Sequence, residues 1–232
     1  MGSVIQGRCN STNQSITGRA MSGWVRAGLL GVILAAGSIG VGTMSHAAVP
    51  EPEPVARRWE LDFKPGAFRI AKVEIEGQPA KAYLYLTYRV ANNSKEDVLF
   101  APVFELSTGE GALLRSGMDV APEVTKKISG LLNSPLLQDQ ISILGTLQQG
   151  EANAREGLVV WNLPAADLSK VSVYASGLSG ETQTVEVIDP ATKEVKRVSL
   201  RKTRMLAYRM PGDVLKQGND PFERVEDRWI MR

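Results

Sequence analysis

The sequence predicts a mainly all-β protein, an antiparallel β-sandwich that carries a short helical insertion around residues 121–146. Three observations lead to this fold class. Residues 81–92 alternate with period two and are rich in aromatic and β-branched side chains, which is typical of a strand. Similar runs recur over residues 156–210, with turn residues between them. Helical and strand segments do not alternate along the chain, so a parallel sheet is not predicted.

The first predicted strand changes parity along its length. Phe68 and Ile70 share one parity, whereas Val73 and Ile75 share the other. Because successive side chains of a strand point to opposite faces, one extra residue is needed to bring all four to the same face. The segment therefore predicts a β-bulge near Ala71.

Both faces of the next predicted strand are largely apolar or aromatic. One face carries Leu84, Leu86, Tyr88 and Val90. The other carries Tyr83, Tyr85, Thr87 and Arg89. Tyr83 and Tyr85, together with Trp161 of a later strand, could stack on sugars or peptides. A strand that is apolar on both faces is more typical of a core, so the core interpretation is favoured.

A polar turn and a strand that contains a proline follow. Residues 92–97 are polar and predict a turn, and residues 98–107 form the next apolar run. Pro102 lies inside that run and cannot donate a backbone hydrogen bond, so an edge position or a bulge is expected there. Residues 108–111 supply the next turn.

The pattern becomes helical after Ala121. Pro122 is suited to the first position of a helix. Four apolar residues recur on one side of the helix that follows: Val124, Ile128, Leu131 and Leu132. Residues 136–147 are apolar, and their pattern fits either a helix or a strand.

Five further strands are predicted after the insertion, in residues 156–164, 170–180, 182–189, 195–200 and 203–210. The turn at Pro190–Glu194 joins two of them in a hairpin. Eight or more short strands, separated by turns and interrupted by one helical insertion, favour an immunoglobulin-like sandwich over residues 59–208.

The N-terminal region has the pattern of a secretory signal peptide. Arg26 precedes an apolar run at residues 27–43, and no Asp or Glu occurs among the first 50 residues. Small residues precede the junction between Ala47 and Ala48, which predicts cleavage there. Residues 1–47 are interpreted as leader and signal, so the mature protein is expected outside the cytoplasm, in the periplasm, in the cell envelope or secreted.

The alternative is an uncleaved membrane anchor. The apolar run has 17 residues, at the short limit for crossing a bilayer. Five of them are glycine, which lowers hydrophobicity and helix propensity, so cleavage is favoured. The first 20 residues are polar, which is unusual for a signal, and Met21 is an alternative start. Residues 48–58 contain alternating Pro and Glu and predict an extended linker.

Cleavage would remove the only cysteine and the only histidine of the chain, Cys9 and His46. The mature chain would then form no disulfide and could not use Ser-His-Asp, Cys-His or zinc chemistry based on Cys or His. Three of the 27 basic side chains lie in the leader, and the remaining 24 face 25 acidic ones, a formal net charge of −1. No nucleic-acid partner, cofactor or metal is therefore expected, and contact with a membrane is expected only through the signal segment.

Two stretches carry motifs of a known kind. They are LTYRVANNSKEDVLFAPVFELSTGEG, residues 86–111, and LQQGEANAREGLVVWNLP, residues 147–164. Both resemble segments of exported bacterial proteins with an immunoglobulin-like β-sandwich domain. The C-terminal YRMPGD…DRWIMR is similar to the end of a group of uncharacterised exported bacterial proteins. The resemblance implies the fold, and its motifs carry no catalytic residues.

Two pairs of carboxylates flank predicted turns: Glu151 with Glu156, and Glu105 with Glu110. A glycoside hydrolase needs two carboxyl groups about 5 to 9.5 Å apart in a cleft. Acidic residues beside turns are ordinarily solvated, and no cleft signature accompanies these pairs, so a catalytic role is not favoured.

Two further motifs are weak. Asp189 and Glu181 lie in turns, without the dense spacing of oxygen ligands that a calcium loop has, so ordinary hairpin turns are favoured. Asn92-Asn93-Ser94 matches a glycosylation acceptor pattern, although a polar turn explains the same residues.

The C-terminal tail, residues 209–232, combines turn residues and charges with large apolar side chains. Phe222, Trp229 and Ile230 are unusual in a disordered tail. The tail is therefore expected either to pack on an edge strand of its own domain or to dock on a partner through these residues, with Trp229 as the anchor. Packing on its own domain is slightly favoured.

The predicted function is an exported, non-catalytic binding or structural module of the cell envelope. An envelope protein is the first class of partner, and a polysaccharide is the second. The prediction rests on elimination and on the fold, which does not by itself fix a function. Two alternatives stay open: a carboxylate-based hydrolase acting on cell-envelope glycans, and a membrane-anchored assembly factor whose N-terminal helix is not cleaved.

Overall fold

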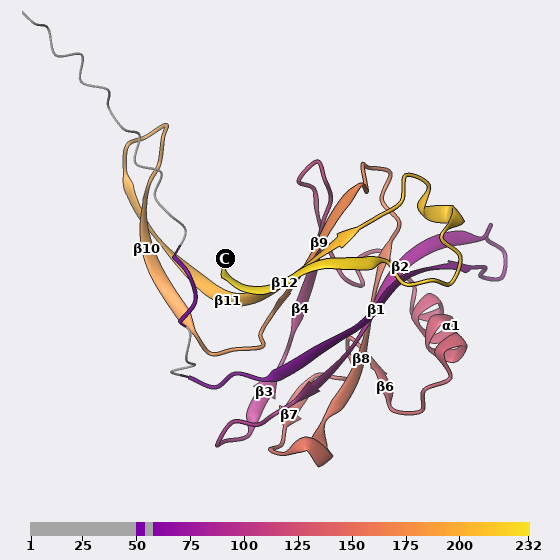
Figure 1. Ribbon diagram of the computed structural model, residues 1–232, viewed down its shortest axis with the longest axis horizontal. Coiled ribbons are helices and arrows are strands. Elements are labelled where there is room, and N and C mark those ends of the chain that lie inside the picture. The colour runs from indigo at the N-terminus through magenta and orange to yellow at the C-terminus, as the bar shows by residue number, and fades with distance from the viewer. Residues whose placement is uncertain (1–49, 54–57) are drawn as a thin grey trace, which may run out of the picture. The chain divides into compact units, whose positions relative to one another are not determined.

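The computed structural model of the chain describes residues 50–53 and 58–232 (Figure 1). The predicted signal with its cleavage point between Ala47 and Ala48 lies outside these residues, as does most of the predicted linker. Within the two described ranges, no helix is both long and apolar enough to cross a membrane.

The described part of the chain is mostly β-structure with one short α-helix, α1 Pro122–Leu132. Single turns of 3-10 helix occur at Glu151–Asn153 and Val214–Lys216. The strands are β1 Asp62–Val73, β2 Lys81–Ala91, β3 Val98–Phe100, β4 Val103–Ser107, β5 Leu113–Arg115, β6 Leu137–Asp139, β7 Gly145–Leu147, β8 Arg155–Asn162, β9 Lys170–Ser176, β10 Thr182–Ile188, β11 Val195–Arg209 and β12 Glu223–Met231. The predicted mainly all-β class is therefore confirmed.

The strands form two larger sheets and one small one. The first sheet has the order β1-β2-β8-β6, and only the short pair of β6 and β8 is parallel. The second has the order β10-β11-β9-β4-β5, and β12 also pairs with β11. β3 and β7 form a separate antiparallel pair.

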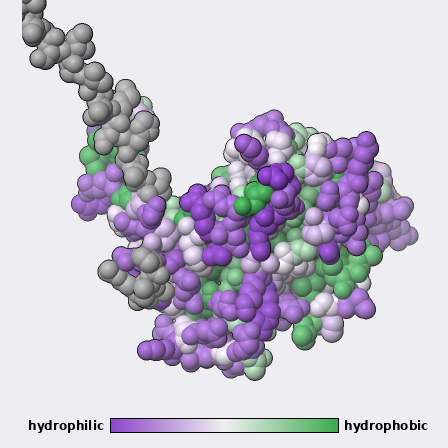
Figure 2. All heavy atoms as spheres, in the orientation of Figure 1, coloured by the Kyte–Doolittle hydropathy of each residue, from purple (hydrophilic) through white to green (hydrophobic). Residues whose placement is uncertain are grey.

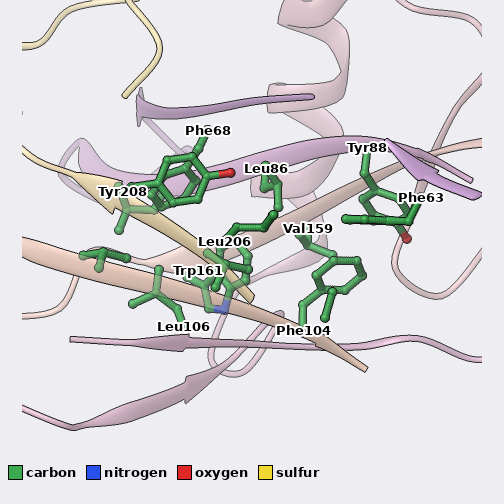
Figure 3. Packing of buried hydrophobic residues seen from close by; sticks show 14 of the residues in the cluster. Phe63, Phe68, Leu86, Tyr88, Phe104, Leu106, Val159, Trp161, Leu206 and Tyr208 are labelled. Carbon is green, nitrogen blue, oxygen red and sulfur yellow. The ribbon is translucent and has the colours of Figure 1, made fainter. Parts of the chain in front are cut away.

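The main core lies between the two larger sheets (Figure 3). Phe68 and Trp161 come from the first sheet, and Phe104 and Leu206 come from the second. Trp161 is 1% exposed, and its indole N–H donates to the carbonyl of Leu114 at 3.1 Å, so the polar atom of this buried ring is satisfied.

A second, smaller core lies between α1 and the other face of the first sheet. Val124 and Ile128 of the helix pack there against Val73, Tyr83 and Tyr85. Both faces of the first sheet are thus covered where the helix lies. This arrangement explains why β2 is apolar on both faces.

The second core also corrects the predicted bulge near Ala71. Val73 belongs to the core under α1, so no extra residue is needed to turn it towards Phe68. The register shift lies instead between Pro65 and Phe68. In that stretch the backbone runs so close to β2 that a Cβ at Gly66 would lie 2.4 Å from Thr87 Oγ1.

The predicted helical insertion is only partly helical. α1 begins at Pro122 as expected and is followed by Asn133, whose φ of 47° is left-handed. Leu131 was expected on the buried side but is 72% exposed, so that part of the prediction is wrong. The segment that fitted either helix or strand contains two short strands, β6 and β7.

Pro102 divides the run that was expected to be one strand. β3 ends before it and pairs with β7, whereas β4 begins after it and pairs with β9 and β5. The missing N–H of the proline would interrupt any ladder that continued through it. The chain therefore changes sheet at this residue.

β11 is a single strand of 15 residues, although two strands were expected there. Its first half pairs with β10 as a ribbon that extends beyond the rest of the second sheet (Figure 1). We call this ribbon, residues 182–201, the arm. Its side chains are mostly exposed, and hydrophobic ones are visible among them (Figure 2).

The C-terminal tail packs on its own domain. β12 pairs with β11 from Glu223 opposite Arg209 to Met231 opposite Lys202. Ahead of it, Phe222 is 4% exposed and lies in the main core.

Candidate binding groove at the C-terminal strand

A groove of about 890 Å³ lies beside β12. Five parts of the chain line it: the segment Pro50–Glu53, Glu60, one residue of β9, two residues of β11, and β12 with the C-terminal Arg232. Its side chains are Tyr174, Lys202, Met205, Arg228, Trp229, Ile230, Met231 and Arg232. Aromatic rings and cations thus face the same space.

Lys202 is the most unusual residue of the groove. It is a charged residue that is only 3% exposed. Its Nζ forms ion pairs with Glu60 at 2.8 Å and with Glu181 at 3.0 Å. Burial alone would lower the pKa of Lys202, but the hydrogen bonds and charges of the two glutamates outweigh it and raise that pKa. The ammonium group therefore stays protonated and leaves a fixed cation at the base of the arm.

Two cations lie against the ring of Trp229. The Nζ of Lys202 lies 5.4 Å from the ring centroid, and the guanidinium carbon of Arg204 lies 5.2 Å from it. Arg204 is itself held by an ion pair with Asp227. The ring is half-buried and packs against the main core, so its orientation is fixed.

A second aromatic residue is arranged in the same way. The guanidinium carbon of Arg232 lies 4.2 Å from the centroid of Tyr174. Arg232 also pairs with Glu105 of β4. The groove therefore has a cation against an aromatic ring at two places.

The segment Pro50–Glu53 already lies in this groove. Pro50 and Pro52 are half-buried, whereas the two glutamates between and after them are exposed. The backbone N–H of Glu53 donates to Glu181 Oε1 at 2.9 Å, and Lys202 Nζ donates to the carbonyl of Glu53 at 3.4 Å. The ion-paired cluster of Lys202 thus holds the backbone of an extended, proline-containing segment.

The carboxylates considered for catalysis are held by structural contacts. Glu151 forms an ion pair with Arg89, and Glu156 accepts a hydrogen bond from Ser134 Oγ at 3.2 Å. In the other pair, Glu105 binds Arg232.

Glu110, the partner predicted for Glu105, is exposed in the turn between β4 and β5. None of these four carboxylates lines the groove.

The two residues considered for calcium serve other purposes. Asp189 accepts backbone N–H groups at the tip of the arm and pairs with Lys196 at 2.7 Å. The hydrogen bond from Lys196, with those of the backbone, lowers the pKa of Asp189. Glu181 binds Lys202. No cluster of three or more acidic, Cys or His side chains that could hold a metal ion occurs in the part of the chain that the structure describes.

Asn92 is a structural residue and not an accessible glycosylation acceptor. It is fully buried, and its amide donates to the carbonyls of Glu96 at 2.8 Å and Leu147 at 2.9 Å. Its side-chain oxygen accepts hydrogen bonds from the backbone and hydroxyl of Ser94. The turn interpretation accounts for this motif.

The aromatic residues of the first sheet belong to cores. Tyr83 and Tyr85 are buried under α1, as the core interpretation predicted. Trp161 pairs with Leu84 across β2 and β8 and therefore lies on the other face from the two tyrosines, in the main core. The three do not form a common face.

The residues predicted to dock on a partner are separated by the fold. Phe222 lies in the core, with its ring centroid 5.4 Å from that of Phe68, so it is not available to a partner. Trp229 and Ile230 do line the groove. Sequence reasoning missed Lys202 and Tyr174. Tyr174 lies within a predicted strand, and Lys202 lies with Arg201 between two predicted strands, where a charged residue gives no signal of burial.

Comparison with protein-family models, with curated proteins and with solved structures found no match for this chain. The arrangement of the groove is therefore the starting point for a function.

Proposed function

We propose that this chain is an exported, non-catalytic binding module of the cell envelope, built as an immunoglobulin-like β-sandwich, and that the groove beside Trp229 is its binding site. The predicted signal peptide supports the export. The antiparallel order of the strands and the core between the two larger sheets support the sandwich.

One observation carries the proposal: a proline-containing segment lines the same groove as two aromatic rings, and its backbone is hydrogen-bonded to Glu181 and Lys202. Proline-rich segments hold an extended conformation at low entropic cost and bind grooves lined with aromatic residues. Pro50 and Pro52 lie in such a groove with Trp229 and Tyr174. Arg228 and Arg232 line the same groove with partly exposed side chains and favour an acidic segment. Lys202 is neutralised by Glu60 and Glu181, and it holds the segment through the backbone carbonyl of Glu53.

The partner that fits best is an extended, acidic, proline-containing segment of another envelope protein. Pro50–Glu53 shows how such a segment fits and would compete with it from within the chain. A polysaccharide is the second class of partner, because aromatic rings also stack on sugars.

A peptide titration tests the proposal. The groove would be freed by changing Pro50 and Pro52 together to serine, which removes the two rings that are half-buried there. The ligand is a synthetic peptide of residues 48–58, AVPEPEPVARR, and the readout is the NMR signal of the Trp229 indole N–H. We expect the double variant to bind the peptide at least about tenfold more tightly than the wild-type chain, because the internal competitor is lost.

Matched variants give the controls. Pro190→Ser changes an exposed proline at the tip of the arm and should leave the wild-type titration unchanged. Adding Trp229→Ala to the double variant should abolish binding. That control is measured by isothermal titration calorimetry, because it lacks the indole signal, and its backbone amide spectrum shows whether it stays folded. A folded double variant that does not bind the peptide would refute the polypeptide partner, and a shift of the same signal by envelope glycan alone would assign the polysaccharide instead.

A further inference from the structure

β10 has an open edge. It is the end strand of the second sheet, and within the described ranges it pairs with no strand other than β11. The N–H of Lys202 donates to the carbonyl of Glu181, so the odd-numbered residues of β10 direct their backbone groups towards β11. The even-numbered residues therefore direct theirs outward, where a further strand could pair.

The edge of β10 has little of the usual protection, and Glu186 is the one charged residue of the strand. Its sequence, TQTVEVI, contains five β-branched residues out of seven and no proline, glycine, lysine or arginine. Exposed edges are ordinarily blocked by a bulge, by proline or by charges, above all lysine. The arm's stretch of β11 is different, because Lys196, Arg197 and Arg201 lie on it. Of the two strands of the arm, β10 is thus the one whose edge is suited to pairing.

One face of the arm is mostly apolar: it carries Val185, Val187, Val198 and Leu200 beside Gln183 and Lys196. The register places Val185 opposite Val198 and Gln183 opposite Leu200, so these side chains share a face with Val187. Val187 is 47% exposed and Val198 is 41% exposed. A ribbon of two strands is marginally stable in water by itself, and a sheet of four strands with one apolar face is much more stable.

We propose that two copies of this chain pair through β10, antiparallel and about a two-fold axis at Val185. Val185 is the middle of Thr182–Ile188, so this register is the one that pairs the whole strand. The result is a closed, symmetric four-stranded sheet made of two arms, in which the apolar faces form one surface.

The side chains are self-complementary in this register. Thr184 lies opposite the partner's Glu186, so a hydroxyl donor meets a carboxylate acceptor and no like charges face each other. Val185 meets its own copy on the apolar face. A different partner strand would need to match this edge by its own sequence, whereas a second copy matches it already.

A cysteine at the axis tests the pairing directly. Because the backbone groups of Val185 face β11, the two copies of this residue form a non-hydrogen-bonded pair with Cα atoms about 4.5 Å apart, within the range of a disulfide. We expect Val185→Cys to form a covalent dimer under mild oxidation of the full chain, in which Cys9→Ser removes the native thiol from this variant and from its control. The matched control, Val225→Cys, changes an exposed valine of β12 and should not.

Charge changes at the same position test the register without oxidation. Val185→Lys and Val185→Glu should each weaken self-association at least about tenfold in sedimentation equilibrium, because like charges meet at the axis. Mixing the two variants should restore dimers, whereas Val225→Lys should leave the wild-type equilibrium unchanged. A wild-type chain that stays monomeric at about 100 µM, or Val185→Cys chains that stay uncoupled, would overturn the proposal. These measurements do not involve the groove, so they can fail or succeed independently of the proposed function.

Discussion

Truncation of Phe222 tests whether the C-terminal tail is part of the fold. The ring is 4% exposed and packs against Phe68, and the backbone N–H of Phe222 donates to the carbonyl of Phe68 at 2.8 Å. Phe222→Ala keeps that hydrogen bond and removes only the ring. The variant therefore measures the packing of the tail on the core.

The magnitude follows from the buried surface. Loss of the ring removes roughly 150 Å² of buried apolar surface, which at about 25 cal/mol/Å² corresponds to ~4 kcal/mol. This value lies within the range of about 3–5 kcal/mol for truncating a buried phenylalanine. For a domain of this size, we expect the melting temperature to fall by roughly 8–16 °C.

Urea unfolding of Phe222→Ala beside wild type gives the change in free energy of unfolding. Val225→Ala is the matched control, because Val225 is 48% exposed on the same tail, and we expect it to change stability by less than about 0.5 kcal/mol. A loss below about 1 kcal/mol for Phe222→Ala would refute the placement of this ring in the core. The tail would then be free to dock elsewhere.

Three further predictions concern single buried groups. Burial raises the pKa of Tyr208 above its ordinary value, whereas the unfolded chain ionises this residue near pH ~10. The free energy of unfolding should therefore fall as the pH rises above that value, and Tyr208→Phe should reduce the slope in urea unfolding between pH 9 and 11. Asn92→Ala removes the buried hydrogen bond to the carbonyl of Leu147 and the partly buried one to Glu96, and it should cost about 2–4 kcal/mol in urea unfolding. Asn93→Ala, in the exposed part of the same turn, should cost less than about 0.5 kcal/mol. Gly157→Ala places a Cβ 2.2 Å from the buried ring of Tyr88 and should lower the melting temperature. A Cβ at Gly130 in α1 would have no atom within 4 Å, so Gly130→Ala should stabilise the fold by about 0.5–1 kcal/mol. An unchanged melting temperature for the first glycine variant would contradict the close approach.

Local patterns predicted the elements that depend on local chemistry. The strand expected at residues 81–92 is β2 Lys81–Ala91, because period two is a property of the strand itself. The helix expected at Pro122 begins there, because the proline suits the first turn of a helix by its own geometry.

Features that depend on distant segments were not predictable in the same way. Val73 was interpreted as a parity error because the sequence does not show that α1 covers the second face of its sheet. Leu131 fits the helical pattern but is exposed, whereas Leu132 beside it packs against the second core. Periodicity shows which residues share a face, and only tertiary packing shows whether that face is covered.

The groove shows the same limit. Trp229 and Ile230 were singled out because large apolar residues are unusual in a charged tail. Lys202 was not, because lysine is typical of a surface and Lys202 lies beside Arg201 in the charged gap between two predicted strands. Its burial depends on Glu60 and Glu181, which reach it from two other segments of the chain.

β11 gives the molecule a mechanical property. Its 15 residues run without interruption from the tip of the arm into the main core, with β9 on one side and β12 on the other over its second half. A partner that pulls on the arm along this strand loads the hydrogen bonds of both neighbours in shear, all together, instead of opening them one by one. Force applied at the tip therefore reaches Leu206 and Tyr208 in the core directly. A load on the arm is thus carried by a strand that pairs with β9, β10 and β12.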